Sequence, residues 1–391
     1  MMPVILQIIG ELMANNRIFL SLSQPGGFEQ EYVQKALDSN WITSGGPNVS
    51  EFENRIADYI GDDSLVIALN SGTSAIHLAL ILLGVKSGDE VICQSMTFSA
   101  SANPILYQGA IPVFVDSELD TWNICPNHLE TAIKERIKKG KKPKAIIAVH
   151  IYGNPYKIDE IHAIANQYQI PIIEDSAEAL GSTYKGKKCG TFGDLGIFSF
   201  NGNKIITASS GGALITKSKV LKEKAIFYAN QAKDFALHYQ HSEIGYNYRM
   251  SNICAGIGIG QMMILDQNVT RRREMHNFYR ILFEKNKDVQ LFKSTNEAYF
   301  SNYWLSTILV EPDIVNSINK ENLQKAFDKA NIECRPLWKP LHLQPVFNKY
   351  PYYGNNIAEN LFAKGLCLPS GSNFSAEEKN RIINNNEKFG R

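Results

Sequence analysis

Residues 65–83, LVIALNSGTSAIHLALILL, carry the pattern from which the fold can be predicted. The first five residues are apolar throughout, which indicates a strand buried on both faces, and a helical pattern follows from Thr73. This alternation continues to about residue 216. Further strand-like runs lie at residues 91–93, 111–115, 145–149, 171–174, 195–200 and 212–216, and helical patterns at 73–83, 99–107, 126–138 and 158–168. We therefore predict an α/β fold with a mostly parallel sheet, which binds its ligands at the carboxyl ends of the strands.

The C-terminal part of the chain has a different pattern. After a long helical stretch at residues 251–285, strands and helices become segregated. Strands or extended pieces are expected at 304–310 and 333–336, and helices at 320–330, 358–366 and 375–384. The sequence thus predicts an N-terminal extension (1–20), a large domain (21–285) that ends in the long helix, and a smaller α+β domain (286–391).

Composition excludes several classes of protein. The 391 residues carry 40 Lys and Arg against 39 Asp and Glu, so a net charge of +1 gives no reason to expect nucleic acid or an anionic membrane as partner. The six cysteines are scattered without a CxxC motif, which argues against a disulfide framework or a zinc site and favours a reducing compartment. With no secretory leader and no apolar run of membrane-spanning length, we expect a soluble cytoplasmic protein that binds no metal.

Three motifs directly follow strand-like runs. NSGTS (residues 70–74) opens a helix, where free N–H groups and Gly72 would cradle a phosphate, although Ser71 acting only as a helix cap is the simpler alternative. EDSAE (174–178) places acids at the end of a buried strand, where they need a cationic partner or serve as a cap. A protonated heterocyclic nitrogen would suit Asp175.

The third motif, FSFNGNK (198–204), ends in a lysine among apolar and amide side chains. Partial desolvation there would favour the neutral amine, a nucleophile towards carbonyl carbon, whereas most lysines are solvated surface groups. The combination is more informative than any one motif. A phosphate cradle, a carboxylate at the end of a buried strand and a sequestered lysine, in this order on an α/β sheet, are the three requirements of pyridoxal 5'-phosphate.

These motifs carry a resemblance to a known family. NSGTSA (70–75), EDSAEALG (174–181), GDLGIFSF (193–200) with Lys204, and GYNYRMSN (245–252) resemble the DegT/DnrJ/EryC1/StrS sugar-nucleotide aminotransferases. The resemblance runs from about residue 18 to the C-terminus. It implies a fold-type-I transferase, similar to aspartate aminotransferase, with a mostly parallel seven-stranded sheet.

The resemblance also implies roles for individual residues. Lys204 is expected to bond covalently to pyridoxal phosphate and then to move the substrate proton, and Asp175 to pair with the ring nitrogen. Phe98 is expected to stack on the ring, and Glu178 to face it. The phosphate contacts are assigned to Gly72, Thr73 and Ser199. Asn252 matches a residue that reaches the phosphate from the neighbouring subunit, which implies a homodimer with shared active sites.

The expected substrate follows from three more segments. SFNGNKIIT (199–207), RPLWKPLH (335–342) and CLPSG (367–371) resemble the branch that aminates a UDP-linked 4-keto-6-deoxy-N-acetylhexosamine at C4, with L-glutamate as donor. The mouth of the site is assigned to Arg335, Trp338, Lys339 and His342. Two alternatives inside the family are amination at another position or of another nucleotide-linked keto sugar, and a sugar dehydratase, in which histidine replaces the lysine.

Two alternative functions outside this chemistry would require other sequence features. A non-catalytic regulator on the same fold would be expected to lack Asp175 or Lys204, and both are present. A nicotinamide-dependent epimerase or reductase would need a strand–glycine–helix fingerprint. Gly256, Gly258 and Gly260 imitate that spacing, but they lie in a helical pattern that no strand precedes.

Overall fold

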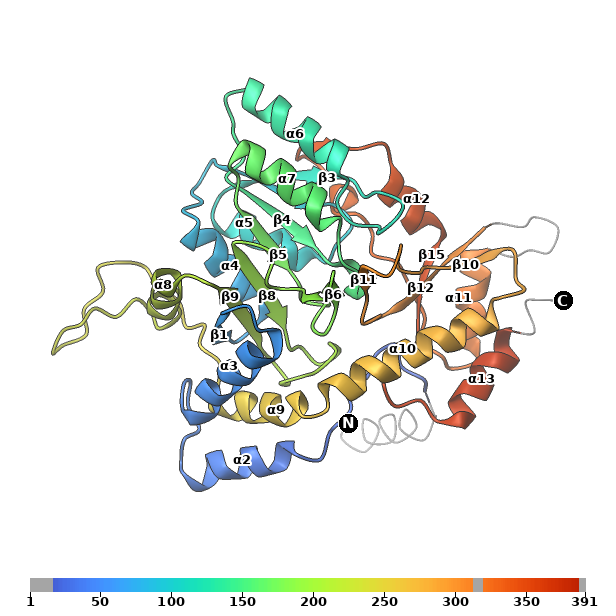
Figure 1. Cartoon of the computed structure of the whole chain (residues 1–391), viewed down its shortest axis with the longest axis horizontal. Coiled ribbons are helices and arrows are strands. Elements are labelled where there is room, and N and C mark those ends of the chain that lie inside the picture. Colours follow the sequence, from blue (N-terminus) through green and yellow to red (C-terminus); the bar gives the residue numbers. More distant parts are fainter. Residues whose placement is uncertain (1–16, 312–318, 387–391) are drawn as a thin grey trace, which may run out of the picture.

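The computed structural model describes residues 17–311 and 319–386, and its centre is a large sheet (Figure 1). Its strand order is β1-β9-β8-β5-β4-β2-β3-β14. The strands are β1 (Leu65–Leu69), β2 (Glu90–Gln94), β3 (Ile111–Val115), β4 (Ala145–Val149), β5 (Ile172–Asp175), β8 (Leu195–Ser199), β9 (Gly212–Thr216) and β14 (Tyr352–Tyr353). The predicted seven strands all form, and the short β14 pairs with β3 as an eighth. The sheet is parallel except at β9, which runs antiparallel to both β1 and β8.

Helices cover both faces of this sheet, as Figure 1 shows. They are α3 (Pro47–Ile60), α4 (Gly72–Leu82), α5 (Asn103–Tyr107), α6 (Pro126–Lys138), α7 (Ile158–Tyr168), α8 (Lys219–Ala229) and α9 (Asn252–Met262). Ile67 and Leu69 of β1 belong to a buried cluster with α4, α5 and α8. Their neighbours Val66 and Ala68 belong to a second cluster with α3 and α9, and a third cluster packs β4 against α6 and α7. Strands that are apolar on both faces therefore produce the doubly covered sheet that was predicted.

The predicted long helix is in fact two helices. α9 ends at Met262, and α10 (Leu265–Leu282) begins after a short break. The small residues of α9 allow close packing on α2 (Glu29–Asp38), because a Cβ on Gly260 would lie 2.6 Å from the Glu29 nitrogen.

A second, four-stranded antiparallel sheet lies in the C-terminal half, in the order β10-β12-β15-β13. Its strands are β10 (Val289–Leu291), β12 (Ser306–Val310), β15 (Gly365–Leu368) and β13 (Arg335–Pro336). Three helices accompany it: α11 (Lys320–Lys329), α12 (Ile357–Lys364) and α13 (Ala376–Asn386). The helix expected over residues 358–366 was too long, because its last two residues belong to β15, a central strand that sequence patterns missed.

The remaining elements are short. β6 (Thr183–Tyr184), β7 (Lys187–Lys188) and β11 (Tyr299–Phe300) form a small sheet, and single 3-10 turns are η1 (Ser99–Ser101), η2 (Ile151–Gly153) and η3 (Leu341–Leu343). Of the N-terminal extension expected at residues 1–20, positions 1–16 lie outside the described residues. Ile18 is buried and forms an isolated bridge with Ile332.

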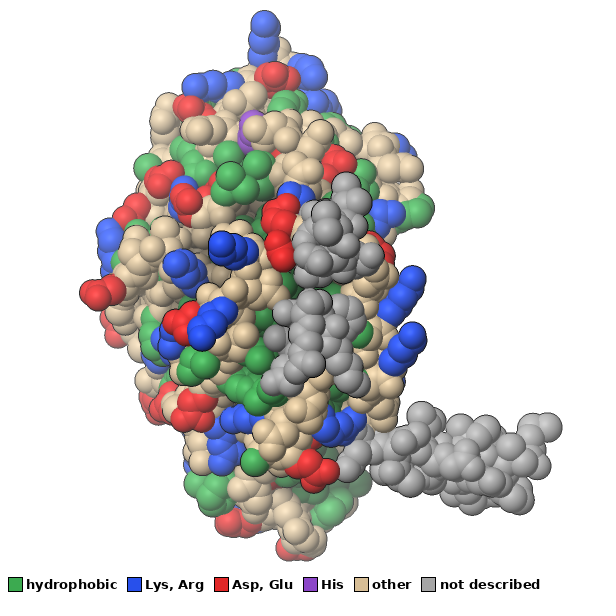
Figure 2. Space-filling view, turned by 90° about the vertical axis from the view of Figure 1, so that its right-hand side faces the viewer, with side chains coloured by type: hydrophobic (Ala, Val, Ile, Leu, Met, Phe, Trp, Pro, Cys, Tyr) green, Lys and Arg blue, Asp and Glu red, His purple; other side chains and the backbone are tan. Residues whose placement is uncertain are grey.

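The surface carries charges of both signs. On the face shown in Figure 2, Lys and Arg side chains are interspersed with Asp and Glu. In the described part of the chain, no helix has both the length and the apolar character that crossing a membrane requires. All six cysteines are free thiols.

Candidate active site

A cavity of about 740 Å³ opens at the carboxyl ends of the parallel strands, between the two larger sheets. Ten of the twelve residues predicted for the site line it. They are Gly72, Thr73, Phe98, Asp175, Glu178, Ser199, Lys204, Arg335, Trp338 and Lys339. Segments more than 200 residues apart in the sequence therefore meet at one place.

The start of α4 forms one wall of this cavity. Ser71 caps the helix, as one of the two alternatives expected, and its hydroxyl accepts a hydrogen bond from the Ser74 N–H at 3.0 Å. The first N–H groups of a helix have no partner within it, and those of Gly72 and Thr73 belong to cavity-lining residues. A Cβ on Gly72 would come within 3.1 Å of the Ser199 Cβ, so glycine keeps this wall open. A capping serine and N–H groups that could hold an anion therefore lie at the same helix end.

Asp175 ends β5 and is held by neighbouring donors. Its Oδ2 accepts a hydrogen bond from the Ser101 hydroxyl at 2.7 Å, and that hydroxyl lies 2.8 Å from the Thr97 hydroxyl. Its Oδ1 accepts a hydrogen bond from the Ala177 N–H at 3.2 Å. The carboxylate is only 5% exposed. It is thus fixed in direction at the strand end, where a protonated ring nitrogen would meet it.

Lys204 lies between an acid and an aromatic ring. Its Nζ is 3.3 Å from Glu178 Oε1 and 4.3 Å from the ring centre of Trp304, and the lysine side chain is 12% exposed. Burial raises the pKa of Glu178 to about 7, partly opposed by the charge of Lys204. The Trp304 indole also donates a hydrogen bond to the carbonyl of Asn203 at 2.7 Å, which fixes the backbone just before the lysine.

Aromatic and cationic side chains form the outer part of the cavity. The Trp338 ring lies 5.8 Å from that of Phe98 and 5.1 Å from that of Tyr152. Arg335 is mostly exposed and pairs with Glu333, with 2.9 Å between Nε and the carboxylate. Lys339 is the second cation of this rim.

Two predicted residues do not line the cavity. The His342 ring stacks on Tyr352 at 3.7 Å, and its nitrogens contact Ser95 and Glu359. Asn252 is fully buried at the start of α9, where its Oδ1 accepts the Asn48 N–H and its amide donates to the Trp41 carbonyl. Both side chains already have partners within this chain.

The residues present fit pyridoxal phosphate. The cofactor needs anion donors, an acid for its ring nitrogen and a primary amine, and these groups line one cavity here as α4, Asp175 and Lys204. Three contributions were not predicted: Ser101, Trp304 and the N-terminal residues Phe19, Leu20, Ser21 and Leu22, which also line the cavity. Ser101 follows Phe98 closely enough to have been a candidate. No motif marks the other two, because only tertiary contacts bring them here.

Comparisons with known proteins point to one family. Residues 24–386, a range that contains every predicted site residue, match the DegT/DnrJ/EryC1/StrS aminotransferase family. The chain is 48% identical over 373 residues to EpsN of Bacillus subtilis, which carries the name of a pyridoxal phosphate-dependent aminotransferase; the match covers 94% of this chain and 95% of EpsN.

Two further relatives are named for sugar-nucleotide reactions. The GDP-perosamine synthase of Escherichia coli O157:H7 is 39% identical (92% of this chain, 95% of that one). A UDP-4-amino-4,6-dideoxy-N-acetyl-beta-L-altrosamine transaminase of Campylobacter jejuni is 38% identical (86% and 88%). The crystal structure of a DegT DnrJ EryC1 StrS aminotransferase from Brucella abortus superposes with a TM-score of 0.86 at 29% identity, covering 93% of this chain and 95% of that one. This chain therefore belongs to the DegT/DnrJ/EryC1/StrS family and is a pyridoxal phosphate-dependent sugar aminotransferase of glycan biosynthesis.

Proposed function

We propose that the chain transfers the amino group of L-glutamate to C4 of a UDP-linked 4-keto-6-deoxy-N-acetylhexosamine. One observation carries the proposal: the Lys204 amine, beside Glu178, lies in the same cavity as a rim with the cations Arg335 and Lys339. Such a rim suits a nucleotide diphosphate, and the amine at its base suits transfer to a carbonyl carbon.

Individual residues of the chain have separate roles in this reaction. Bound pyridoxal phosphate supplies an electron sink for the carbon that loses its proton. Asp175, oriented by Ser101, would hold the proton on the ring nitrogen. Lys204 would take the proton from Cα of L-glutamate in the first half of the transfer and would deliver a proton to C4 of the sugar in the second half. Glu178, with a pKa of about 7, can exchange a proton with Lys204 near neutral pH.

The outer cavity would select the sugar nucleotide. Arg335 and Lys339 are placed to meet the diphosphate, and Phe98 and Trp338 offer apolar surface to the sugar and its acetamido group. The segments at 199–207, 335–342 and 367–371 resemble the branch that uses N-acetylated sugars. The C. jejuni transaminase, whose name contains an N-acetylated UDP sugar, supports the same choice.

A GDP-linked 4-keto sugar without an acetamido group is the second candidate. It is favoured by the GDP-perosamine synthase of E. coli, whose identity to this chain is 39% against 38% for the UDP-sugar enzyme.

The deciding experiment offers both substrates to the same enzyme. Purified, cofactor-loaded chain is mixed with L-glutamate and either the UDP-linked N-acetylated 4-keto sugar or a GDP-linked 4-keto-6-deoxyhexose, and released 2-oxoglutarate is measured. We expect kcat/KM for the UDP sugar to be higher by at least about tenfold, and NMR of the product to show the amine at C4. Lys204→Ala is the control for background release. A preference for the GDP sugar, or amination at another carbon, would reject this substrate assignment.

We also propose that the enzyme is a homodimer with shared active sites. It is proposed to work in the cytoplasm, where its six free thiols would stay reduced.

An arm between α8 and α9 projects from the body of the molecule (Figure 1). It carries fully or largely exposed apolar side chains: Phe235, Leu237, Tyr239 and Ile244. Apolar groups gathered on such an arm favour a protein partner, and a second copy of this chain is the partner we propose.

A further inference from the structure

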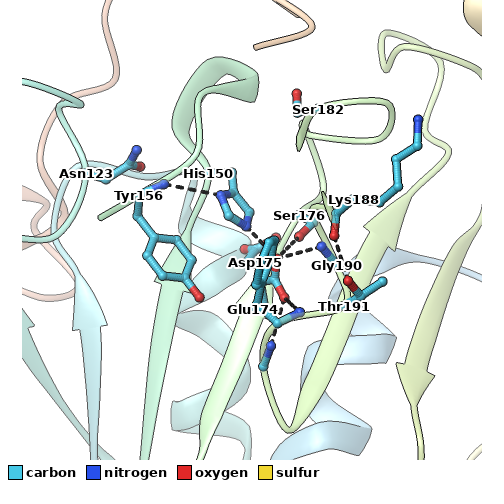
Figure 3. A network of polar contacts seen from close by, with 12 residues as sticks. Asn123, His150, Tyr156, Glu174, Asp175, Ser176, Ser182, Lys188, Gly190 and Thr191 are labelled. Carbon is cyan, nitrogen blue, oxygen red and sulfur yellow. Dashed lines mark hydrogen bonds and ion pairs between the residues drawn. The ribbon is translucent and has the colours of Figure 1, made fainter. Parts of the chain in front are cut away.

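A second buried carboxylate lies next to Asp175. Glu174 precedes it in β5, and because successive side chains of a strand point to opposite faces, Glu174 points away from the cofactor cavity. Figure 3 shows it between His150, at the end of β4, and Gly190. Glu174 is fully buried, and the reaction described above makes no use of it.

Both oxygens of Glu174 are occupied by donors. Oε1 accepts from the Gly190 N–H at 2.6 Å and lies 2.7 Å from His150 Nε2. Oε2 accepts from the N–H groups of Phe192 and Gly193 at 2.7 and 2.9 Å. These three N–H groups belong to residues 189–193, the loop between β7 and β8. The loop thus folds around the carboxylate and stabilises its negative charge.

The glycines of this loop are needed for the close approach. Gly190 has a φ of +93°, a conformation that L side chains rarely adopt. A Cβ on Gly193 would meet the Ile172 carbonyl at 2.9 Å and the Glu174 Cβ at 3.0 Å. The backbone is therefore shaped to bring its N–H groups to Glu174.

His150 contacts Glu174 through one ring nitrogen and the backbone of Tyr156 through the other. Its Nδ1 accepts a hydrogen bond from the Tyr156 N–H at 3.4 Å, and its Nε2 faces Glu174. The Tyr156 ring stacks on the imidazole at 4.7 Å. The His150 backbone N–H in turn donates to the Asp175 carbonyl at 3.1 Å, so the same residue contacts both acids of β5.

A bound metal ion explains the contacts of Glu174 less well than hydrogen bonding does. His150, Glu174 and Cys189 place ligand atoms within 4.8 Å of one another. A carboxylate has about four lone-pair directions, and those of Glu174 already accept from three N–H groups and His150. Burial would raise the pKa of Glu174, but the contacts with His150, Gly190 and Gly193 outweigh it and hold this pKa below its ordinary value. These contacts thus hold Glu174 as an anion.

We propose that Glu174 is a positioning residue for Asp175: its ionised carboxylate clamps the end of β5 to β4 and to the loop at 189–193. Asp175 is thereby held at the angle that keeps a proton on the cofactor's ring nitrogen. The negative charge of Glu174, one residue away, also favours the protonated ring. This proposal rests on the assignment of pyridoxal phosphate but not on the identity of the sugar.

Glu174→Gln tests the proposal in the cofactor-loaded enzyme. Glutamine keeps the shape, but its amide presents N–H groups where the loop also presents N–H groups. Asp194→Asn is the matched control, because Asp194 Oδ2 accepts the Ile172 N–H at 2.8 Å, at the other end of β5. Two readouts are needed. The first is 15N NMR of cofactor labelled at its ring nitrogen, which reports whether that nitrogen is protonated. The second is thiol labelling followed by peptide mass spectrometry, which reports the exposure of Cys189, a buried residue of the loop.

We expect Glu174→Gln to shift the ring-nitrogen signal towards the unprotonated form and to speed Cys189 labelling by about tenfold or more, since buried donors lose their acceptor. Asp194→Asn should match the wild type in both. A normal ring-nitrogen signal in Glu174→Gln, whatever the labelling rate, would overturn the positioning role. If Glu174→Gln fails to fold, His150→Phe is the deciding variant, because it keeps the ring stacked on Tyr156 but removes the contact with Glu174. It should shift the ring-nitrogen signal in the same direction by a smaller amount. An unchanged ring-nitrogen signal in His150→Phe would again overturn the positioning role. A wild-type protein that binds no cofactor would reject the cofactor assignment instead.

Discussion

At the residue scale, we propose that Lys204 carries the chemistry, and its removal should leave the fold intact. The side chain lies at the wall of an open cavity, next to Glu178 and Trp304, so Lys204→Ala creates no void in the core. We expect turnover with L-glutamate and keto sugar to fall by at least about a thousandfold, the loss typical of a proton-transferring group. Lys217→Ala, which removes an exposed lysine paired with Asp62, should retain activity and serves as the control. Turnover by Lys204→Ala at the wild-type rate without added amine would contradict this role.

Ser101 is predicted to act through Asp175. Ser101→Ala removes the 2.7 Å hydrogen bond to Asp175 Oδ2 and leaves the Thr97 hydroxyl without this partner. We expect the dissociation constant of pyridoxal phosphate to rise by about tenfold, because a hydrogen bond to a charged group is lost. Equilibrium dialysis measures this constant. Ser99→Ala, in the same short turn, should bind the cofactor as the wild type does, and equal affinity in all three proteins would exclude the role.

Glu178 should make stability depend on pH. Burial raises its pKa from 4.5 to about 7, so between these pH values the native chain keeps a proton that the unfolded chain has released. Its contribution to the free energy of unfolding therefore falls as the pH rises through this window, by an amount on the order of 3 kcal/mol. In urea denaturation of the cofactor-free protein, Glu178→Gln should flatten this decline. The exposed Glu223→Gln should not, and an undiminished decline in Glu178→Gln would refute the assignment.

At the scale of elements, β8 and the loop before it depend on glycine. A Cβ on Gly196 would lie 2.0 Å from the Gly190 carbonyl oxygen, which is backbone and cannot move aside cheaply. We expect Gly196→Ala to lower the free energy of unfolding by about 2–4 kcal/mol, measured by urea denaturation. Gly202→Ala is the control, because a Cβ there meets nothing within 4 Å. Equal stability of the two variants would show that the loop can shift away.

The elements predicted well are those with a local signal. Strands buried on both faces are apolar along their length, so all seven long strands of the large sheet were found from short runs. β15 was missed because it follows α12 without a turn, at Gly365. The break between α9 and α10 contains neither proline nor glycine, and two-residue strands such as β14 exist only through their long-range pairing.

The same distinction holds for the site. Asp175 ends a strand, and Gly72 and Lys204 follow strands. Because parallel strands end at a common edge, the meeting of these residues in one cavity could be predicted. Trp304 reaches Lys204 from the loop before β12, and nothing near it in the sequence marks that contact. His342 lies in a recognisable motif, but its ring stacks on Tyr352, a contact made from another segment.

At the scale of the whole molecule, the projecting arm should hold two copies together. Changing Phe235 and Leu237 to serine replaces fully exposed apolar side chains, so it should leave the melting temperature of the protomer fold unchanged. Sedimentation velocity should show the wild type as a dimer and the double variant shifted towards the monomer. Changing the exposed Val220 of α8 to serine is the control. A double variant that stays dimeric would remove the arm from the interface.

The central claim, that this cavity binds pyridoxal phosphate and accepts an amino group, is tested most directly by an absorbance spectrum. The purified chain is loaded with pyridoxal phosphate, freed of excess, and its visible spectrum is recorded before and after addition of L-glutamate. We predict a visible band that depends on Lys204 and bleaches with glutamate as the amino group is transferred. A chain that shows no band even after reconstitution would contradict the claim.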